Sequence, residues 1–414
     1  MRPDSDADPR DMFLSVMSKR SIKAALLQVH SVIGLALSLV LALIGVTGAT
    51  MSFEEEIVAG LNAGMMRVET RSTPMLTPDE LIARLRTTRD LGKVSAVTMS
   101  RDPSAAVRVR FARSEDGSRP SSFYVDPYDA NVLGTPRAED FFATVRKLHR
   151  WLMLPDDGKG YGRPITGVAT IGLIVMLISG IVLRWPDRAR SVKIWLKPNL
   201  ALRGRGLHRS LHAVAGTWVL LVYLVMALTG LWYSFEWYKN SAIWLLSRPS
   251  AATAPMQPKS PRGAGDARPA DAKIADAKPF ALDRAWSVFL HEQGSRYAMA
   301  QLTLPAGAGT VVRIRSRAQD ASHDGARDEF RIDAATGKLV SSEIYADKTA
   351  GERILSSVFD IHRGSIFGWP GKLLFMVAAA LMPLFAVTGI MLYLSRRRQR
   401  RTARPALGSL VPGE

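Results

Sequence analysis

The 414-residue sequence contains no cysteine. This absence excludes disulfides, thiolate metal ligands, cysteine-bound iron–sulfur clusters and covalently attached c-type haem. Any redox centre must therefore be held by histidine, methionine, tyrosine, carboxylates or backbone atoms. The sequence also lacks a Rossmann glycine fingerprint, a flavin-domain pattern and a P-loop, so we expect no use of NAD(P)H or ATP within this chain.

Charged residues are missing from four long apolar segments, which span residues 24–53, 164–183, 211–235 and 373–394. A helix needs about 20 apolar residues to cross a hydrocarbon core of about 30 Å, and each segment reaches that length. The first segment is too long for a signal-peptide core and has no small-residue cleavage site after a short core. The sequence therefore predicts an α-helical integral membrane protein with four transmembrane helices.

The net charge of +18 comes mainly from short segments beside the apolar runs. Basic residues concentrate at the end of 1–23, in 184–210 and in 395–414, so the positive-inside rule places these segments and both termini in the cytoplasm. The long connections 54–163 and 236–372 then lie outside. Basic and acidic residues nearly balance in the first connection, so the net charge is an insertion signal and we expect no nucleic-acid partner.

The first and third apolar segments are repeats of one unit. A shift of 182 residues aligns residues 27–34 with 209–216, and the same shift places Thr47-Gly48 on Thr229-Gly230. Such internal similarity indicates a duplicated structural unit.

The second and fourth segments also correspond, although their spacing differs by four residues. The Leu-His-Arg sequence at 148–150 recurs as Ile-His-Arg at 361–363, and the span that follows contains Ser179-Gly180 or Thr388-Gly389. The sequence therefore predicts two duplicated pairs of transmembrane helices.

Both long connections have the pattern of a small α+β module. The first has a helix at 77–86, with Thr77 and Glu80 in the spacing of a capping box, and then strands at 94–100, 106–111, 122–125 and within 126–134. The second repeats this order, with a helix at 282–291 and strands at 297–304, 310–316, 329–332 and 339–344. Residues 251–279 are rich in Ala, Pro, Asp, Gly and Lys, and we expect a linker there.

The sequence resembles the PepSY-associated transmembrane helix family, which includes iron-regulated membrane proteins and haem-containing ferric-siderophore reductases of bacterial inner membranes. The resemblance covers about residues 20–400 and rests on short motifs: His30 with Gly34, His212 with Gly216, the two Thr-Gly pairs, and Leu148–Leu152. Residues 123–134 and 330–340 resemble PepSY domains. The resemblance implies two periplasmic PepSY-like modules, ferric siderophores as substrates and iron acquisition as the pathway.

Four histidines sort into an inner pair and an outer pair. In this topology His30 and His212 lie at the cytoplasmic ends of the first and third helices, and His149 and His362 lie at the outer ends of the second and fourth. Two imidazoles that face each other between helices can hold a b-type haem iron axially. A lone histidine could equally be an interfacial residue bonded to a carbonyl or to water, but that reading does not predict two repeat-matched pairs. We therefore expect two haem b groups with these four axial ligands.

Other residues near the pairs are candidates for haem contacts. Gly34 and Gly216 lie one helical turn after the inner histidines, where a missing side chain would let a porphyrin approach the backbone. His208 lies four residues before His212. The repeat favours His212 as the ligand and His208 as a propionate or proton partner, with a direct ligand role for His208 as the alternative. Basic side chains beside the histidines are candidates for propionate pairing, although membrane-interface anchoring explains them too: Arg150 and Arg363 outside, Arg209 and Arg205 inside.

One haem near each membrane face would provide two redox centres through which an electron could cross the membrane. We therefore expect an oxidoreductase in which a separate donor, a quinol or a cytoplasmic reductase, supplies electrons and a ferric siderophore is reduced outside. Reduction would release iron, because hard oxygen ligands hold Fe(III) better than Fe(II). Two alternatives stay open: a haem-free PepSY binding or regulatory protein of the envelope, and a chelate transporter, for which the spans lack the expected charged residues and broken helices.

Overall fold

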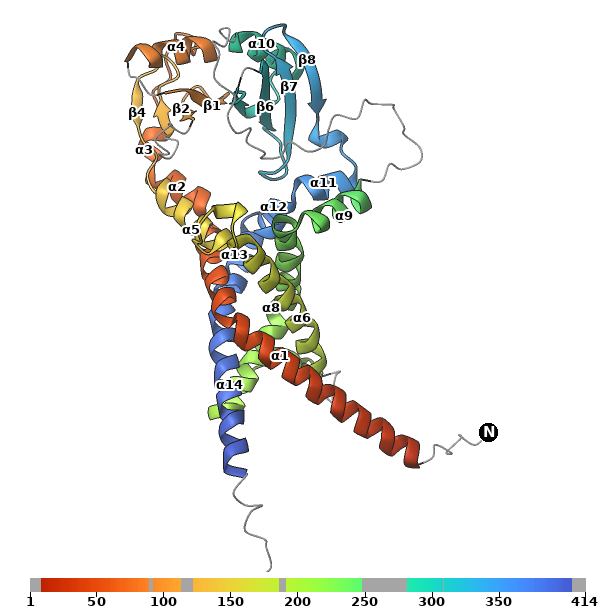
Figure 1. Ribbon diagram of the computed structural model, residues 1–414. Helices are drawn as coiled ribbons and strands as arrows, with labels where there is room; N and C mark the ends of the chain where they lie inside the picture. Colours follow the sequence, from red (N-terminus) through yellow and green to blue (C-terminus); the bar gives the residue numbers. More distant parts are fainter. Residues whose placement is uncertain are drawn as a thin grey trace, which may run out of the picture. The chain divides into compact units, whose positions relative to one another are not determined.

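The computed structural model describes residues 9–88, 92–112, 122–185, 191–247, 281–307 and 309–403 (Figure 1). The expected linker at 251–279 and the ends of the expected terminal segments, 1–8 and 404–414, lie outside the described residues. The chain divides into two compact units. We call them the helical unit (Met1–Ser52, Phe142–Asn240 and Ile361–Glu414) and the sheet unit (Phe53–Phe141 and Ser241–Asp360).

In the described part of the helical unit, four helices are long and apolar enough to cross a membrane. They are α1 (Pro9–Met51), α6 (Gly162–Arg184), α8 (Gly204–Ser234), and the consecutive α13 (Gly368–Ala380) and α14 (Met382–Ala403), which together form the fourth span. The four predicted membrane helices are thus confirmed. Each begins before the charge-free segment that predicted it, because helix formation continues into the polar flanks.

The spanning helices pack in a ring. α1 lies beside α6 and α14, and α8 lies beside the same two helices (Figure 1). The Tyr223 hydroxyl donates to the carbonyl oxygen of Ala378 at 2.7 Å, which satisfies a polar group inside the bundle. Around it the ring is filled by apolar side chains that include Leu41, Ala169, Val219, Phe375 and Met382.

The fourth span is interrupted at Leu381. Pro383 lies in the first turn of α14, and proline cannot donate the backbone hydrogen bond that would continue α13. Gly45 of α1 packs at this break, where an added Cβ would lie 2.6 Å from the Ala379 carbonyl oxygen. The expectation that no span is broken is therefore wrong for the fourth. The buried Lys372 also lies within its apolar stretch, so the span is free of charge only from residue 373.

Shorter elements connect the spans. Along the chain, α5 (Glu139–Trp151) precedes α6, α7 (Val192–Leu196) precedes α8, and α12 (Val358–His362) precedes α13. The indole Nε1 of Trp218 donates to the Leu196 carbonyl oxygen at 3.1 Å and holds α7 against α8. Further short helices are α2 (Glu54–Leu61), α3 (Ala63–Met66), α9 (Glu236–Leu246) and α11 (Ala350–Ser356), with 3-10 turns at Asp157–Lys159, Tyr345–Asp347 and Ser365–Phe367.

The sheet unit contains one antiparallel sheet of eight strands in the order β4-β3-β2-β1-β5-β6-β7-β8. Both expected modules have the predicted order of one helix and four strands, but they are not two sheets: β1 pairs with β5, with Val97 opposite Leu302. Each module's first strand would otherwise be an open edge, and pairing the two removes both edges. The strands are β1 (Val94–Ser100), β2 (Val107–Phe111), β3 (Ser122–Val125), β4 (Val132–Gly134), β5 (Tyr297–Thr303), β6 (Val311–Ala318), β7 (Arg327–Asp333) and β8 (Lys338–Glu343).

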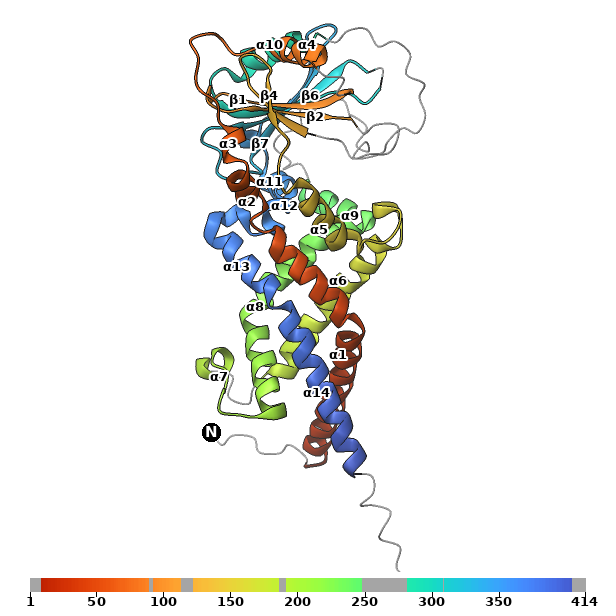
Figure 2. The same ribbon diagram turned by 90° about the vertical axis from the view of Figure 1, so that its left-hand side faces the viewer.

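Two helices, α4 (Pro78–Thr88) and α10 (Leu282–Gln293), cover one face of this sheet (Figure 2). The predicted capping box of α4 is present, since the Thr77 amide donates to Glu80 Oε2 at 3.0 Å. The two helices also cap each other: the Asp79 amide donates to Asp283 Oδ1 at 2.9 Å, and the Asp283 amide donates to Asp79 Oδ2 at 3.0 Å. Each carboxylate thus satisfies an N-terminal amide of the neighbouring helix.

Candidate functional site

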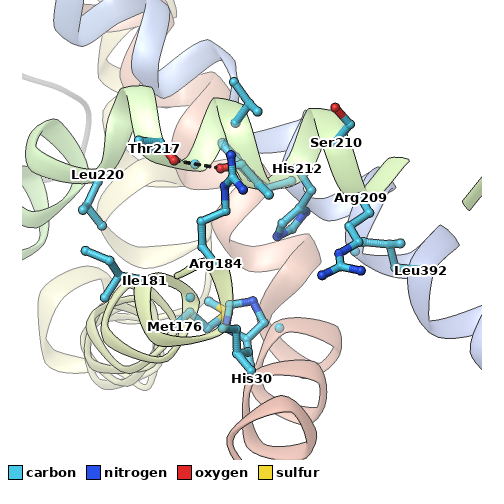
Figure 3. Close-up of a pocket in the computed structure, with 18 of the residues that line it drawn as sticks. His30, Met176, Ile181, Arg184, Arg209, Ser210, His212, Thr217, Leu220 and Leu392 are labelled. Atoms are coloured by element: carbon cyan, nitrogen blue, oxygen red, sulfur yellow. Dashed lines mark hydrogen bonds between the residues drawn. The ribbon is translucent and has the colours of Figure 1, made fainter. Parts of the chain in front are cut away.

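The first histidine pair lies where α1 and α8 face each other. The ring centroids of His30 and His212 are 6.2 Å apart, and the ring planes are inclined by 73°. Both rings line one cavity of about 1000 Å³, formed by α1, α6, α8, α14 and the α7 segment. Figure 3 shows the two histidines in this cavity, with Arg184 and Arg209 beside them. The structure thus brings together the two histidines that the sequence repeat matched.

The second histidine pair joins α5 and α12. The ring centroids of His149 and His362 are 6.4 Å apart, and the planes are inclined by 70°. The Tyr233 ring lies 6.3 Å from the His362 ring, and the Arg150 guanidinium lies 5.9 Å from the Tyr233 ring. Burial lowers the pKa of His149 to about 3 and that of His362 to about 4. Both rings are therefore neutral at pH 7, and each can present a nitrogen lone pair.

A hydroxyl group from a neighbouring spanning helix holds each of the four imidazoles at Nδ1. The helix differs in each case, so every spanning helix supplies one hydroxyl. The Nδ1–Oγ distances are 2.9 Å for His30–Ser179, 2.8 Å for His212–Thr388, 3.0 Å for His149–Thr47 and 2.8 Å for His362–Thr229.

A glycine follows each of these hydroxyl residues and lies against the same ring. A Cβ added at Gly48 would lie 3.2 Å from His149 Cε1, and one added at Gly180 would lie 3.4 Å from His30 Cε1. The corresponding distances are 3.7 Å from Gly230 to His362 and 3.8 Å from Gly389 to His212. Each hydroxyl–glycine pair therefore provides a flat surface on which the imidazole packs, and this contact is closest at Gly48.

A comparison with known families shows to which family the chain belongs. The family model of the PepSY-associated TM region matches residues 27–396, which include all four paired histidines. The chain belongs to the PepSY-associated transmembrane family. A comparison with curated proteins finds no match.

The ring separations in this PepSY-associated protein fit a metal ion held between two imidazoles. A five-membered ring with bonds close to the peptide C–N length places its atoms about 1.15 Å from the centroid. With imidazole–metal bonds of about 2.0–2.1 Å, two rings on opposite sides of one ion have centroids about 6.3–6.5 Å apart. The observed separations are 6.2 and 6.4 Å.

Among the described residues, no three or more His, Cys, Asp or Glu side chains are grouped so that they could hold a metal ion. An ion between two histidines would therefore need its other coordination positions filled by a ligand from outside the protein. A planar macrocycle with four nitrogen donors fills the positions that an axial pair leaves.

The cavity beside His30 and His212 is strongly basic at one end. Its lining contains no acidic side chain among the residues that the structure describes. The Arg184 guanidinium lies 5.5 Å from the Trp195 ring, which fixes it near the cavity wall. The cavity is suited to an apolar ligand with anionic groups, because apolar side chains form most of the rest of its lining. The basic lining residues are Arg184, Lys193, Lys197, Arg209 and Arg396.

The structure separates the remaining candidates. Gly34 and Gly216 line the cavity, as does Arg209, whereas His208 is not among the lining residues. Arg205 instead donates to Gln399. Near the His149–His362 pair, Arg363 Nε donates to Ser365 Oγ at 3.2 Å.

The four hydroxyl residues and Arg184 and Arg396 were not predicted as site residues. The sequence contained a signal for the hydroxyls, because a hydroxyl–glycine pair recurs in all four spans. The role of this pair can be assigned only when the neighbouring helices are known, since each hydroxyl contacts a histidine that is 102 to 176 residues away in sequence.

Proposed function

We propose that this membrane protein binds two b-type haems, one at each histidine pair, and transfers electrons across the membrane to a ferric chelate. The observation that supports this proposal best is the presence of two facing imidazole pairs, each with the ring separation of an axial ligand pair. His30 and His212 would hold one haem, and His149 and His362 the other. When bound, haem supplies reversible one-electron chemistry at its iron.

The spacing of the pairs along the helices suits transfer across a membrane. His30 and Thr47, which contacts His149, are 17 residues apart on α1, and His212 and Thr229 have the same separation on α8. At 1.5 Å per residue this corresponds to about 26 Å, close to the hydrocarbon thickness of about 30 Å. The charge distribution favours the cytoplasmic face for the His30–His212 pair and the periplasm of a bacterial inner membrane for the other.

The acceptor would be an Fe(III) siderophore, and the donor a separate quinol or reductase. The chain's part would be to hold both redox groups through the four histidines, His30 with His212 and His149 with His362. Transfer of one electron to the chelate converts Fe(III) to Fe(II), which oxygen-donor chelators bind more weakly. The released Fe(II) would then be available for uptake.

The basic end of the cavity would bind the propionates of the first haem. Arg209→Gln should therefore weaken haem binding at His30 and His212 by up to about fivefold, as expected for an exposed ion pair. Arg205→Gln is the matched control, because Arg205 contacts Gln399 and is not part of the lining. Haem titration of both variants measures the effect. Equal losses in the two variants would contradict a specific propionate contact.

Optical spectra of the purified full chain test the proposed function. We expect a low-spin b-type spectrum in the oxidised and dithionite-reduced states, with two haems per chain. Adding a hydroxamate Fe(III) chelate to the reduced protein should restore the oxidised spectrum and yield Fe(II), which a ferrous-specific chelator can trap. A chain without haem would instead be a binding or regulatory protein, and the proposal would be wrong.

A further inference from the structure

We propose that Ser179, Thr388, Thr47 and Thr229 are positioning residues that fix the tautomer of the four histidines, so that each Nε2 lone pair is available to a metal. This inference rests on the proposed function for its redox consequence. Its structural part concerns the protein alone and can be tested separately.

The first argument is the number of protons on each hydroxyl. A serine or threonine hydroxyl has one proton to donate. In all four residues that proton is directed to the carbonyl oxygen four residues earlier, so the hydroxyl oxygen must accept the hydrogen bond from the imidazole. The Oγ–O distances are 2.7 Å for Ser179–Val175, 2.6 Å for Thr388–Leu384, 2.7 Å for Thr47–Leu43 and 2.6 Å for Thr229–Val225.

A backbone carbonyl gives an independent argument for the same tautomer at His149. The Ile44 carbonyl oxygen lies 3.0 Å from His149 Nδ1, and a carbonyl can only accept. His149 Nδ1 therefore carries the proton whatever the orientation of the Thr47 hydroxyl.

The consequence for metal binding lies at the opposite nitrogen. In a neutral imidazole one nitrogen donates and the other accepts, so a proton on Nδ1 leaves the lone pair on Nε2. A hydrogen bond from Nδ1–H also fixes the ring orientation and makes the ligand more basic, which favours Fe(III) over Fe(II). The hydroxyls would thus set both the affinity for haem and its reduction potential.

The four positions differ in how much they depend on the hydroxyl. The Ile44 carbonyl can keep the His149 proton at Nδ1 when the Thr47 hydroxyl is removed. His212 has the Thr388 hydroxyl as the Nδ1 partner that the structure shows. Thr388→Val should therefore have the larger effect and Thr47→Val the smaller, although both substitutions remove one hydroxyl and keep the side-chain shape.

The experiment measures haem affinity and the potential of each centre in the full chain. Thr388→Val should weaken haem binding at His30 and His212 about tenfold, the lower end of the usual range for a lost outer-shell hydrogen bond. Loss of the hydrogen bond should also raise the reduction potential of that centre. A tenfold change in the relative affinity for Fe(III) and Fe(II) corresponds to about 59 mV. Thr388→Ser should restore both values. Thr50→Val is the control, since the Thr50 hydroxyl bonds to the Val46 carbonyl in the same way and is exposed.

A second readout is independent of haem. Nitrogen-15 spectra of histidine-labelled full chain, produced under haem limitation and recorded at pH 8, should show Nδ1–H tautomers for the four paired histidines. Thr388→Val should shift His212 towards the Nε2–H form. Unchanged tautomer and potential in this variant would overturn the inference. If the wild-type chain binds no haem, the proposed function fails, while the tautomer measurement still decides the role of the hydroxyls.

Discussion

His362→Ala is expected to reduce the haem content from two per chain to one and to abolish reduction of a ferric chelate. The substitution removes one of two axial ligands and leaves His149 facing an empty position. A single imidazole without its partner holds the iron on one side only. The other haem should remain, because His212 lies about 26 Å along α8 from Thr229, which contacts His362. Haem extraction, reduced spectra and chelate reduction measure the three effects.

Variants of the other pair provide the controls. His212→Ala should remove the other haem and leave the His149–His362 spectrum, whereas His208→Ala should keep both, because His208 is not among the residues that line the cavity. Loss of both haems from either ligand variant would show that the centres do not form independently. Loss of one haem from the His208 variant would contradict the assignment of His212 as the ligand.

Gly45→Ala is expected to destabilise the helical unit and lower the occupancy of both haem sites. A methyl group at Gly45 would meet Met382 and the Ala379 carbonyl oxygen at the break between α13 and α14. Small residues at such crossings allow helix backbones to approach closely, and overpacking typically costs about 1–3 kcal/mol. Because α14 also supplies Thr388 and α1 supplies Thr47, a shift of these helices displaces residues that contact both histidine pairs.

Thermal unfolding of the purified protein, followed by haem absorbance and by circular dichroism, measures this effect. Gly60→Ala is the matched control, since a Cβ at Gly60 on α2 meets no atom within 4 Å. The control should unfold at the wild-type temperature or slightly above it, because alanine favours a helix over glycine. A Gly45 variant with wild-type stability would mean that α1 and α14 can separate at no cost.

The histidine pairs could be predicted because the sequence motifs around the histidines recur along the chain. The motif around His30 recurs around His212 at a constant shift, and the one around His149 recurs at His362. Apolar segments then assign each histidine to a particular helix end. The contacts of the rings could not be predicted in this way, because Ser179 reaches His30 only once α6 is known to lie beside α1.

The strands show the same limit of sequence-based prediction: their bounds could be predicted, but not their neighbours. Alternation of apolar residues predicted β1 at its observed bounds and placed most of the others within a residue or two. It could not predict that β1 pairs with β5, because alternation identifies the buried face of a strand but not its neighbour. Pro383 in the sequence indicated a cause for the break at Leu381, but the hydropathy pattern alone predicted one continuous helix.

The pairing of β1 with β5 also affects how this protein is made. Val97 and its partner Leu302 are about 200 residues apart in sequence, so at about 5–20 residues per second a ribosome needs about 10–40 s to pass from one to the other. During this interval β1 has one edge without a partner, and its free amide and carbonyl groups can pair with another nascent chain. A fragment that ended before β5 would keep that edge permanently, so the first module is a poor candidate for expression as a separate domain.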